Sequence, residues 1–473
     1  MKQTNKQSRY PVGLGVLTFA EFWDRFSFCG TLTVLLLYVT HILHYSDSKA
    51  YALWGTYVAL GYITPVIGGW LVDRGLSFKL ALIVGLLCMI GGNSVLMWMH
   101  PQGFYFGLAL TLCGIGLFKG NISTLVGRLY PSGDTQRDQG YARFFMGIIL
   151  GATLGPLVLG FLAMYVGWPM VFLVSAGGQL LALALFWHYR ACWEVIRENK
   201  NMDLWFFVTA VSLLTILLGI LLAYPVHSNN LLGLSALAVF LVMTGWIVNQ
   251  CRVQIKKIVG LTLISLLLIA YYAASMQVSG SLVMAIERYF PVYIGHWLLS
   301  PTAFAALEAG CAFLFIPLFA RLWNYMAAHN HAPSLFFKMG LGHVLAAASF
   351  AIFSWVFFTK SALLLGLIIA NVLLGMSVVC VFPTHLSLIS QYAPVAIQGT
   401  LMGMSFLPDA LAGYVASVVT QLPVTYTLGG ALYTHIYLNI AAVIFVIGMI
   451  IFLLAPLWGL LFHERNNLAF IGS

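Results

Sequence analysis

Long apolar stretches dominate the sequence and are the feature that most limits its fold. A helix needs about 20 apolar residues to cross a hydrocarbon core of about 30 Å, and fourteen stretches meet that requirement. Hydrophobic residues make up 61% of the chain and charged residues only 7%, against roughly a quarter charged in an ordinary soluble domain. We therefore predict an all-α membrane protein with fourteen spans, at 12–42, 51–72, 79–99, 104–129, 140–165, 169–190, 204–223, 231–250, 258–285, 300–326, 336–358, 361–390, 396–420 and 431–461.

The formal net charge of +9 indicates how the chain is oriented in its membrane. If both termini are cytoplasmic, the outer loops hold only Lys49, Arg288 and Lys360, and the other basic residues outside the spans lie on the cytoplasmic side. This asymmetry follows the positive-inside rule, and the basic residues form no patch of the kind that binds nucleic acid. We predict a multi-pass protein of the cytoplasmic (inner) membrane, monomeric, with both termini in the cytoplasm.

The order of the spans predicts three parts. Residues 1–190 form a first bundle of six helices, 191–257 a linker with two extra transmembrane helices, and 258–473 a second bundle of six helices. Two six-helix bundles joined by an intracellular connection are typical of major facilitator transporters, which place their substrate near the membrane midplane. The two extra helices carry no charge between Leu204 and Gln250, and we expect them to be peripheral and to face lipid.

Three charges interrupt the first span. Glu21, Asp24 and Arg25 have the spacing i, i+3 and i+4 and therefore share one helical face. A charge near the bilayer centre costs a few kcal/mol and indicates a functional site by default. Two carboxylates that share one guanidinium titrate as a unit, and one proton is easily bound near neutral pH, as a proton-coupled carrier requires. The alternative is an ion pair that only fixes the first span against its neighbours.

Other ionisable residues inside spans are isolated in the sequence. Lys119 lies in a glycine-containing segment where helices approach closely, so an anionic group is expected to meet it; the alternative is a lysine whose ammonium extends toward the membrane surface. Glu308 and Asp409 are single acids on apolar helices, either protonated and silent or exposed in a water-filled cavity.

Histidine and aromatic residues inside the spans have two possible roles each. His343 and His385 either transfer protons or hold structural hydrogen bonds. Tyr62 is one of several aromatic residues that either line a cavity or anchor at an interface.

Catalytic or metal-binding patterns are missing from the sequence. The seven cysteines show no Cys-x-x-Cys spacing, and no nucleophile–base pair or metal-ligand spacing is recognisable. We therefore expect no enzyme activity, no metal and no cofactor, with a proton gradient as the driving force.

Several motifs resemble those of one transporter family. The segment EFWDRFSF at 21–28 resembles the ExxERF signature of the proton-dependent oligopeptide transporters (the POT or PTR2 family), a branch of the major facilitator superfamily. FKGNIS at 118–123 resembles their motif FKPNIS, and FFMGIILGA at 144–152 resembles FYMGINLGA. PTHLS at 383–387, with the pair Ala-Pro at 393–394, is similar to their helix-ten motif. The likeness covers nearly the whole chain, including the two extra helices that bacterial members carry.

The resemblance implies a proton-coupled symporter that imports peptides of two or three residues by alternating access. It implies that Glu21, Asp24 and Arg25 couple protons, together with Lys119 and Glu308. Arg25 and Lys119 are expected to face the substrate carboxylate, which their charge supports independently. Tyr62 and His385 are further candidates for substrate contact.

The chain departs from the family pattern at five positions of the expected pocket. Leu32 and Met276 stand where the family has an arginine and a glutamate that pair, so the loss of both leaves no unpaired buried charge. Ile149, Glu308 and Val378 stand where it has asparagine, asparagine and glutamate around the peptide amino group. We expect Glu308 to supply the missing negative charge, to either the substrate ammonium or Lys119.

The altered pocket leaves two alternatives open. One is a major facilitator carrier for a different solute, such as a modified amino acid, a siderophore-like molecule or a drug. The other is a sensor that keeps the fold without transport. In each case the partners are the lipid bilayer and a small solute, joined by protons in a carrier.

Overall fold

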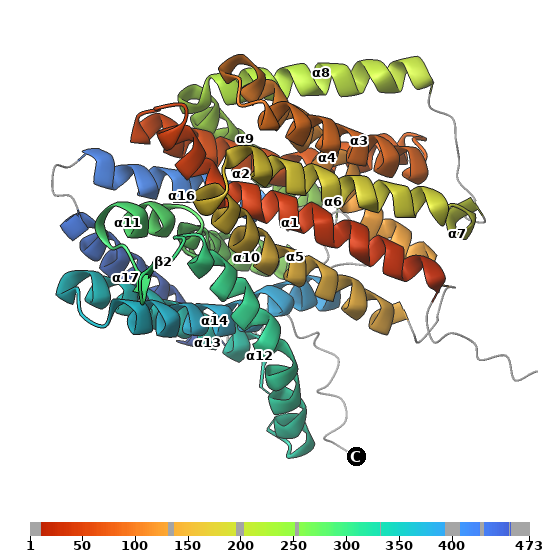
Figure 1. Ribbon diagram of the computed structural model, residues 1–473. Coiled ribbons are helices and arrows are strands. Elements are labelled where there is room, and N and C mark those ends of the chain that lie inside the picture. The colour runs from red at the N-terminus through yellow and green to blue at the C-terminus, as the bar shows by residue number, and fades with distance from the viewer. Residues whose placement is uncertain are drawn as a thin grey trace, which may run out of the picture.

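The computed structural model is built almost entirely from long helices (Figure 1). It describes residues 11–130, 137–194, 203–250, 255–331, 333–392, 407–425, 430–453 and 455. Thirteen helical segments in this part of the chain are long and apolar enough to cross a membrane. The remaining predicted span, 396–420, begins outside the described residues and continues in α16, Leu407–Thr425.

The first group of helices follows the predicted spans to within a few residues. It comprises α1 (Val12–His41), α2 (Asp47–Asp73), α3 (Phe78–Met97), α4 (Pro101–Arg128), α5 (Arg137–Tyr165) and α6 (Trp168–His188), with a short α7 (Ala191–Glu194). Helix α1 packs on α5 and α6, and α4 packs on α2 and α3. Gly167, with φ of 131°, forms the turn from α5 to α6 in a backbone conformation that other residues rarely adopt.

The last group holds α10 (Ile255–Ser275), α12 (Ala303–Ala328), α13 (Leu335–Thr359), α14 (Leu363–Tyr392), α16 and α17 (Gly430–Leu453). The predicted span 258–285 is a broken helix, because a 3-10 turn, η2 (Met276–Val278), separates α10 from α11 (Ser281–Tyr289). A short hairpin of β1 (Tyr293–Ile294) and β2 (Trp297–Leu298) follows. Helix α13 packs on α14 and α17, and α12 packs on α14. The division at 1–190, 191–257 and 258–473 stays a prediction.

The two extra helices, α8 (Leu204–Ala223) and α9 (Pro225–Gln250), differ in their surroundings. Helix α8 lies at the edge of the molecule against α4 (Figure 1) and exposes large apolar side chains such as Trp205 and Leu213, as expected for a peripheral helix. Helix α9 also contacts α2 and α16. Its Asn229 is buried and donates to Ser417 Oγ of α16 at 3.1 Å, so α9 is more closely integrated than the sequence suggests.

Contacts join the two groups at the end of the molecule where α1 stops and α2 starts, which we call the closed end. There Arg288 of α11 binds the carboxylate of Asp47, with Nη2 2.7 Å from Oδ1. His41 Nε2 lies 2.9 Å from Glu287 Oε1, and the hydroxyls of Tyr51 and Tyr433 are 3.3 Å apart. Thr302 of α12 donates to the Pro156 carbonyl of α5 at 2.8 Å. These contacts hold α1, α2 and α5 against α11, α12 and α17.

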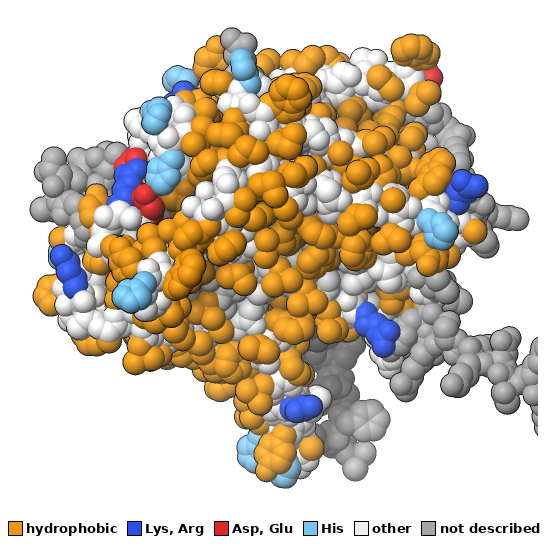
Figure 2. All heavy atoms as spheres, in the orientation of Figure 1, with side chains coloured by type: hydrophobic (Ala, Val, Ile, Leu, Met, Phe, Trp, Pro, Cys, Tyr) orange, Lys and Arg blue, Asp and Glu red, His pale blue; other side chains and the backbone are white. Residues whose placement is uncertain are grey.

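The visible face of the molecule carries a broad apolar band (Figure 2). Its Lys, Arg, Asp and Glu side chains gather toward the two ends of the helices, and hydrophobic side chains cover the surface between them. The backbone polar groups of this band are paired inside helices, as lipid contact requires. A few charged residues lie inside the molecule and not at these ends, and they include Glu21, Asp24, Arg25 and Asp409.

Candidate functional site

The charge cluster of α1 forms as its spacing predicts. Arg25 Nε donates to Glu21 Oε1 at 2.8 Å, and Arg25 Nη2 lies 3.1 Å from Asp24 Oδ2. Glu21 and Asp24 are 1% and 0% exposed. Within the described part of the chain, Glu21 Oε2 and both oxygens of Asp24 have no hydrogen-bond partner. One guanidinium thus faces two buried carboxylates and compensates only one of their two negative charges, and three carboxylate oxygens keep free capacity for a proton or a donor.

A glycine stripe on α5 sets the position of this cluster. Gly147, Gly151 and Gly155 are spaced four residues apart and face the backbone of α1. A Cβ atom at Gly151 would lie 2.8 Å from the Arg25 Cβ and would also clash with the Phe22 carbonyl. Only the absence of side chains lets the two helices approach so closely. The geometry of Arg25 therefore depends on α5 as well as on α1.

Lys119 of α4 reaches the same region from another helix. Its Nζ lies 4.3 Å from the ring centroid of Tyr62 and 5.5 Å from that of Phe28. Glu21 and Asp24 both lie within electrostatic range of the ammonium. No ion pair within 4.0 Å joins Lys119 to another described residue, so this ammonium is held by aromatic faces and by longer-range attraction.

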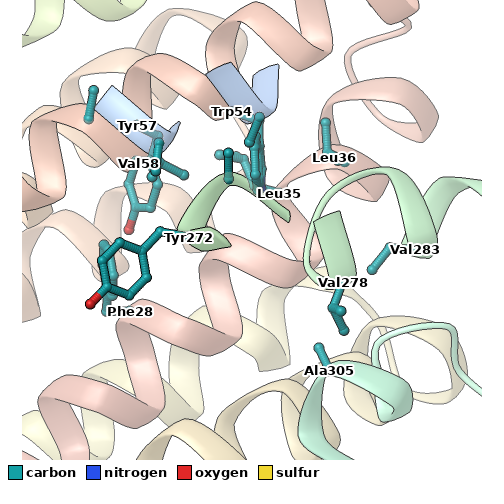
Figure 3. Close-up of a cluster of buried hydrophobic side chains, with 14 of the residues drawn as sticks. Phe28, Leu35, Leu36, Trp54, Tyr57, Val58, Tyr272, Val278, Val283 and Ala305 are labelled. Atoms are coloured by element: carbon teal, nitrogen blue, oxygen red, sulfur yellow. The ribbon is translucent and has the colours of Figure 1, made fainter. Parts of the chain in front are cut away.

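Aromatic residues connect this cluster with the last group of helices. Figure 3 draws Tyr272 of α10 in one buried cluster with Phe28 of α1 and Tyr57 of α2. The hydroxyl of Tyr272 lies 3.1 Å from Nδ1 of His385, and the other ring nitrogen of His385 lies 3.3 Å from Ser265 Oγ. His385 is therefore held by two hydroxyls and positions Tyr272.

Asp409 of α16 lies close to this aromatic group. It is 8% exposed, and no hydrogen bond or ion pair joins its carboxylate to another described residue. Among those residues, Lys119 is the charged group that acts on it. Tyr62 and Tyr272 both lie within electrostatic range of the Asp409 carboxylate. The acid near Lys119 from the second group of helices is thus Asp409.

Glu308 occupies a separate place on α12. Its Oε1 accepts a hydrogen bond from Ser275 at 2.8 Å. Ser275 is the last residue of α10, immediately before the 3-10 turn that starts at Met276. Glu308 therefore sits beside a break in a membrane helix, where backbone polar groups also become available. The structure places no cation beside it among the described residues.

The apolar residues at the expected pocket positions are partly exposed, and their role in binding stays a prediction. Ile149, Met276, Val378 and Leu32 are each half-buried. The carbonyl of Leu32 accepts a hydrogen bond from the indole nitrogen of Trp54 at 3.1 Å, and this bond joins α1 to α2 at Leu32. His343 is fully buried, with Nδ1 2.8 Å from the Met339 carbonyl of its own helix α13.

Sequence reasoning missed Ser275 and Tyr272, and it missed the partners of Asp409. Ser275 and Tyr272 precede the break in the ninth span, and a hydroxyl run before a helix break is a weak signal that was present in the sequence. Asp409 was recognised only as an isolated acid, because its partners come from α2 and α4. Its relation to Lys119 requires the packing of α16 on α2, which no spacing within one segment reveals.

The chain resembles known transporters over nearly its full length. Residues 76–436 match the model of the POT family. The uncharacterized transporter YclF of Bacillus subtilis is 28% identical, with 94% of each chain covered. A di-/tripeptide transporter of Lactococcus lactis is also 28% identical, covering 89% of this chain and 92% of the relative.

Solved structures of peptide transporters also resemble the chain over nearly its full length. A peptide transporter POT in complex with sulfate has a TM-score of 0.83 and 26% identity, with 96% of each chain covered. A mutant of a peptide transporter POT in complex with alafosfalin has a TM-score of 0.84, also at 26% identity and with 96% of each chain covered.

Two helix bundles around buried charges define the protein as a membrane transporter of the major facilitator fold. Within that class the chain belongs to the POT family, since the family match spans most of its length. The family and the fold class predicted from the sequence are therefore confirmed. The relatives and neighbours are transporters.

We predict that Gly151→Ala disturbs the site through α1. The new methyl group forces α1 and α5 apart at Arg25, and overpacking of this kind typically costs about 1–3 kcal/mol. Thermal unfolding in detergent should show a lower Tm, and uptake by reconstituted vesicles should fall. Gly177→Ala on α6 is the matched control, because a Cβ there meets no atom within 4 Å. Equal Tm values for the two variants would contradict the assigned packing.

Proposed function

We propose that the protein is a proton-coupled symporter that imports di- and tripeptides or peptide-like solutes. The observation that carries this proposal is the buried cluster of Glu21, Asp24 and Arg25, which holds two acids on one guanidinium. Protonation of one acid weakens its hold on Arg25 and so changes the charge presented to the centre of the molecule. A solute whose binding depends on that charge is then coupled to the proton.

The charges suit a molecule with a carboxylate at one end and an ammonium at the other. Lys119, together with Arg25 once an acid is protonated, offers cations for the carboxylate. Glu308 offers a negative group whose described partner is the neutral hydroxyl of Ser275. A short peptide carries both charges at its two ends, and the relative of Lactococcus lactis is named a di-/tripeptide transporter.

Alternating access requires the closed end to open. The pairs Arg288–Asp47 and His41–Glu287 must separate for α11 to move away from α1 and α2. By the distribution of basic loop residues, this end faces the outside of the cytoplasmic membrane and both termini face the cytoplasm. A proton and a solute that bind together shift this equilibrium through their different affinity for the two states.

A carrier for another small solute is the second candidate. It is favoured by Ile149 and Val378, which place aliphatic side chains where the family resemblance implies polar ones around the amino group. A phosphonopeptide, alafosfalin, is bound by one structural neighbour, so related pockets accept peptide analogues. A modified amino acid, a siderophore-like molecule or a drug fits such a pocket, and a non-transporting sensor would show binding without uptake.

Uptake by reconstituted vesicles separates these functions. With an inside-alkaline pH gradient, labelled Ala-Ala should accumulate above its external concentration, because an inward proton flow drives it. Unlabelled dipeptides and tripeptides should compete, and free alanine should not. If Ala-Ala neither enters nor competes with a transported solute, the peptide assignment fails and the second candidate stands.

We predict that Glu308→Gln weakens binding of Ala-Ala about tenfold or more, because a hydrogen bond to a charged group is worth about 1.5–3 kcal/mol. The change removes the charge and keeps the side-chain shape. Binding of N-acetyl-Ala-Ala, which lacks the ammonium, should be weak and unaffected by the substitution. Isothermal titration of both ligands measures the two effects, and an unchanged affinity for Ala-Ala would remove Glu308 from the site.

A further inference from the structure

The contact between α2 and α16 has a regular register that brings Asp409 to the substrate region. A Cβ atom at Gly55 of α2 would clash with Ser417 of α16. Val58 lies about one turn further along α2, and there a Cβ atom at Gly413 of α16 would lie 2.6 Å from Val58 Cγ1. The two helices run antiparallel, so the next turn sets Tyr62 against Asp409. The register of the packing therefore puts Asp409 opposite Tyr62, and the Asp409 carboxylate acts electrostatically on the Tyr62 hydroxyl.

Lys119 approaches the same ring from α4. Its ammonium lies 4.3 Å from the Tyr62 centroid, and α4 is held close to α2 at Gly116, whose Cβ would lie 2.8 Å from Thr64 Cβ. Tyr62 thus has a cation of the first group of helices over its ring and an acid of the last group opposite it in the helix register. Each charge acts on the other, since Asp409 is buried and Lys119 is half-buried among aromatic rings, where the effective dielectric constant is below that of water.

The two cations near the site differ in how they are occupied. Arg25 is bound by Glu21 and Asp24 at 2.8 and 3.1 Å. Lys119 has no such partner among the described residues, and Asp409 has none either. A carboxylate entering this region therefore meets Lys119 as the available cation, and Asp409 as the acid already attracted to it.

We propose that Asp409 is an internal competitor of the substrate carboxylate for Lys119, which balances the ammonium in the empty transporter and is displaced by the cargo. This proposal rests on the proposed function for the nature of the cargo. Asp409 is a positioning residue in this scheme: it acts through Lys119 across the interface between the two groups of helices. Displacement frees α16 from an attraction to the α2–α4 side, so binding of the cargo alters how strongly the two groups are held together.

Paired ligands test the competition. Affinities for Ala-Ala and for its C-terminal amide, Ala-Ala-NH2, are measured by isothermal titration on wild type and Asp409→Asn. Removing the competitor should tighten Ala-Ala about fivefold or more, in the range typical of coupled sites. Ala-Ala-NH2 has no carboxylate that could bind the freed Lys119. Its affinity for Asp409→Asn should therefore stay within about twofold of its affinity for wild type. Asp409→Glu keeps an acid and should remain closer to wild type, and Glu308→Gln should not tighten Ala-Ala.

Two results would overturn the proposal. If Asp409→Asn weakens both ligands equally, Asp409 binds the ammonium of the cargo. If neither affinity changes, the carboxylate does not influence the site. If wild type itself binds neither ligand, it is the proposed function that fails. The interaction between Lys119 and Asp409 is then measured in the absence of any ligand.

A thermal double-mutant cycle supplies that cargo-independent measurement. Tm is determined in detergent for Lys119→Gln, Asp409→Asn and the double variant. Each single change leaves one charge uncompensated, whereas the double change leaves none. The double variant should therefore lose less Tm than the sum of the two single losses, by about 2 °C or more. Additive shifts in Tm would show that Lys119 and Asp409 do not interact and would overturn the proposal.

Discussion

The sharing of one guanidinium by two carboxylates inside a membrane helix is the interaction on which the rest of the structure depends. Arg25 cannot satisfy Glu21 and Asp24 fully, and no water is available in the hydrocarbon region to complete the bonding. The surrounding helices must therefore exclude lipid and control what else reaches these oxygens. The glycines of α5 do the first by pressing backbone against backbone, and Lys119 contributes to the second from α4.

Aromatic side chains carry this arrangement across to the second group of helices. Lys119 lies over the ring of Tyr62, which is opposite Asp409 in the register of α2 and α16, while Tyr272 extends from α10 and is fixed by His385. Rings of this kind attract a cation on their faces and exclude water, so the charges influence one another over longer distances than in water. The cation of one group and the acid of the other then sense a change in cargo or protonation together. This is the physical basis for coupling a chemical event to a movement of the two groups.

Much of this could be predicted from the sequence, because membrane helices follow directly from apolar length. The spans agree with the helices to within a few residues, and the cluster of α1 follows from helical spacing. Three features could not be predicted. The break at Met276 is marked in the sequence only by a short stretch that contains Ser and Gln, the partnership of Asp409 depends on the packing of α16 against α2, and the contact of α9 with α16 depends on Gly233 against Tyr414 as well as on Asn229. Each arises from tertiary contacts between distant segments, which local periodicity does not encode.

The central claim is that the Glu21 carboxylate exchanges a proton in step with cargo, and one pair of assays on Glu21→Gln measures it directly. Vesicles loaded with unlabelled dipeptide report exchange of labelled dipeptide without a gradient, and empty vesicles with an imposed pH difference report uphill accumulation. Because the amide cannot titrate, exchange should persist while accumulation is lost. Accumulation at the wild-type level in the variant would contradict the claim.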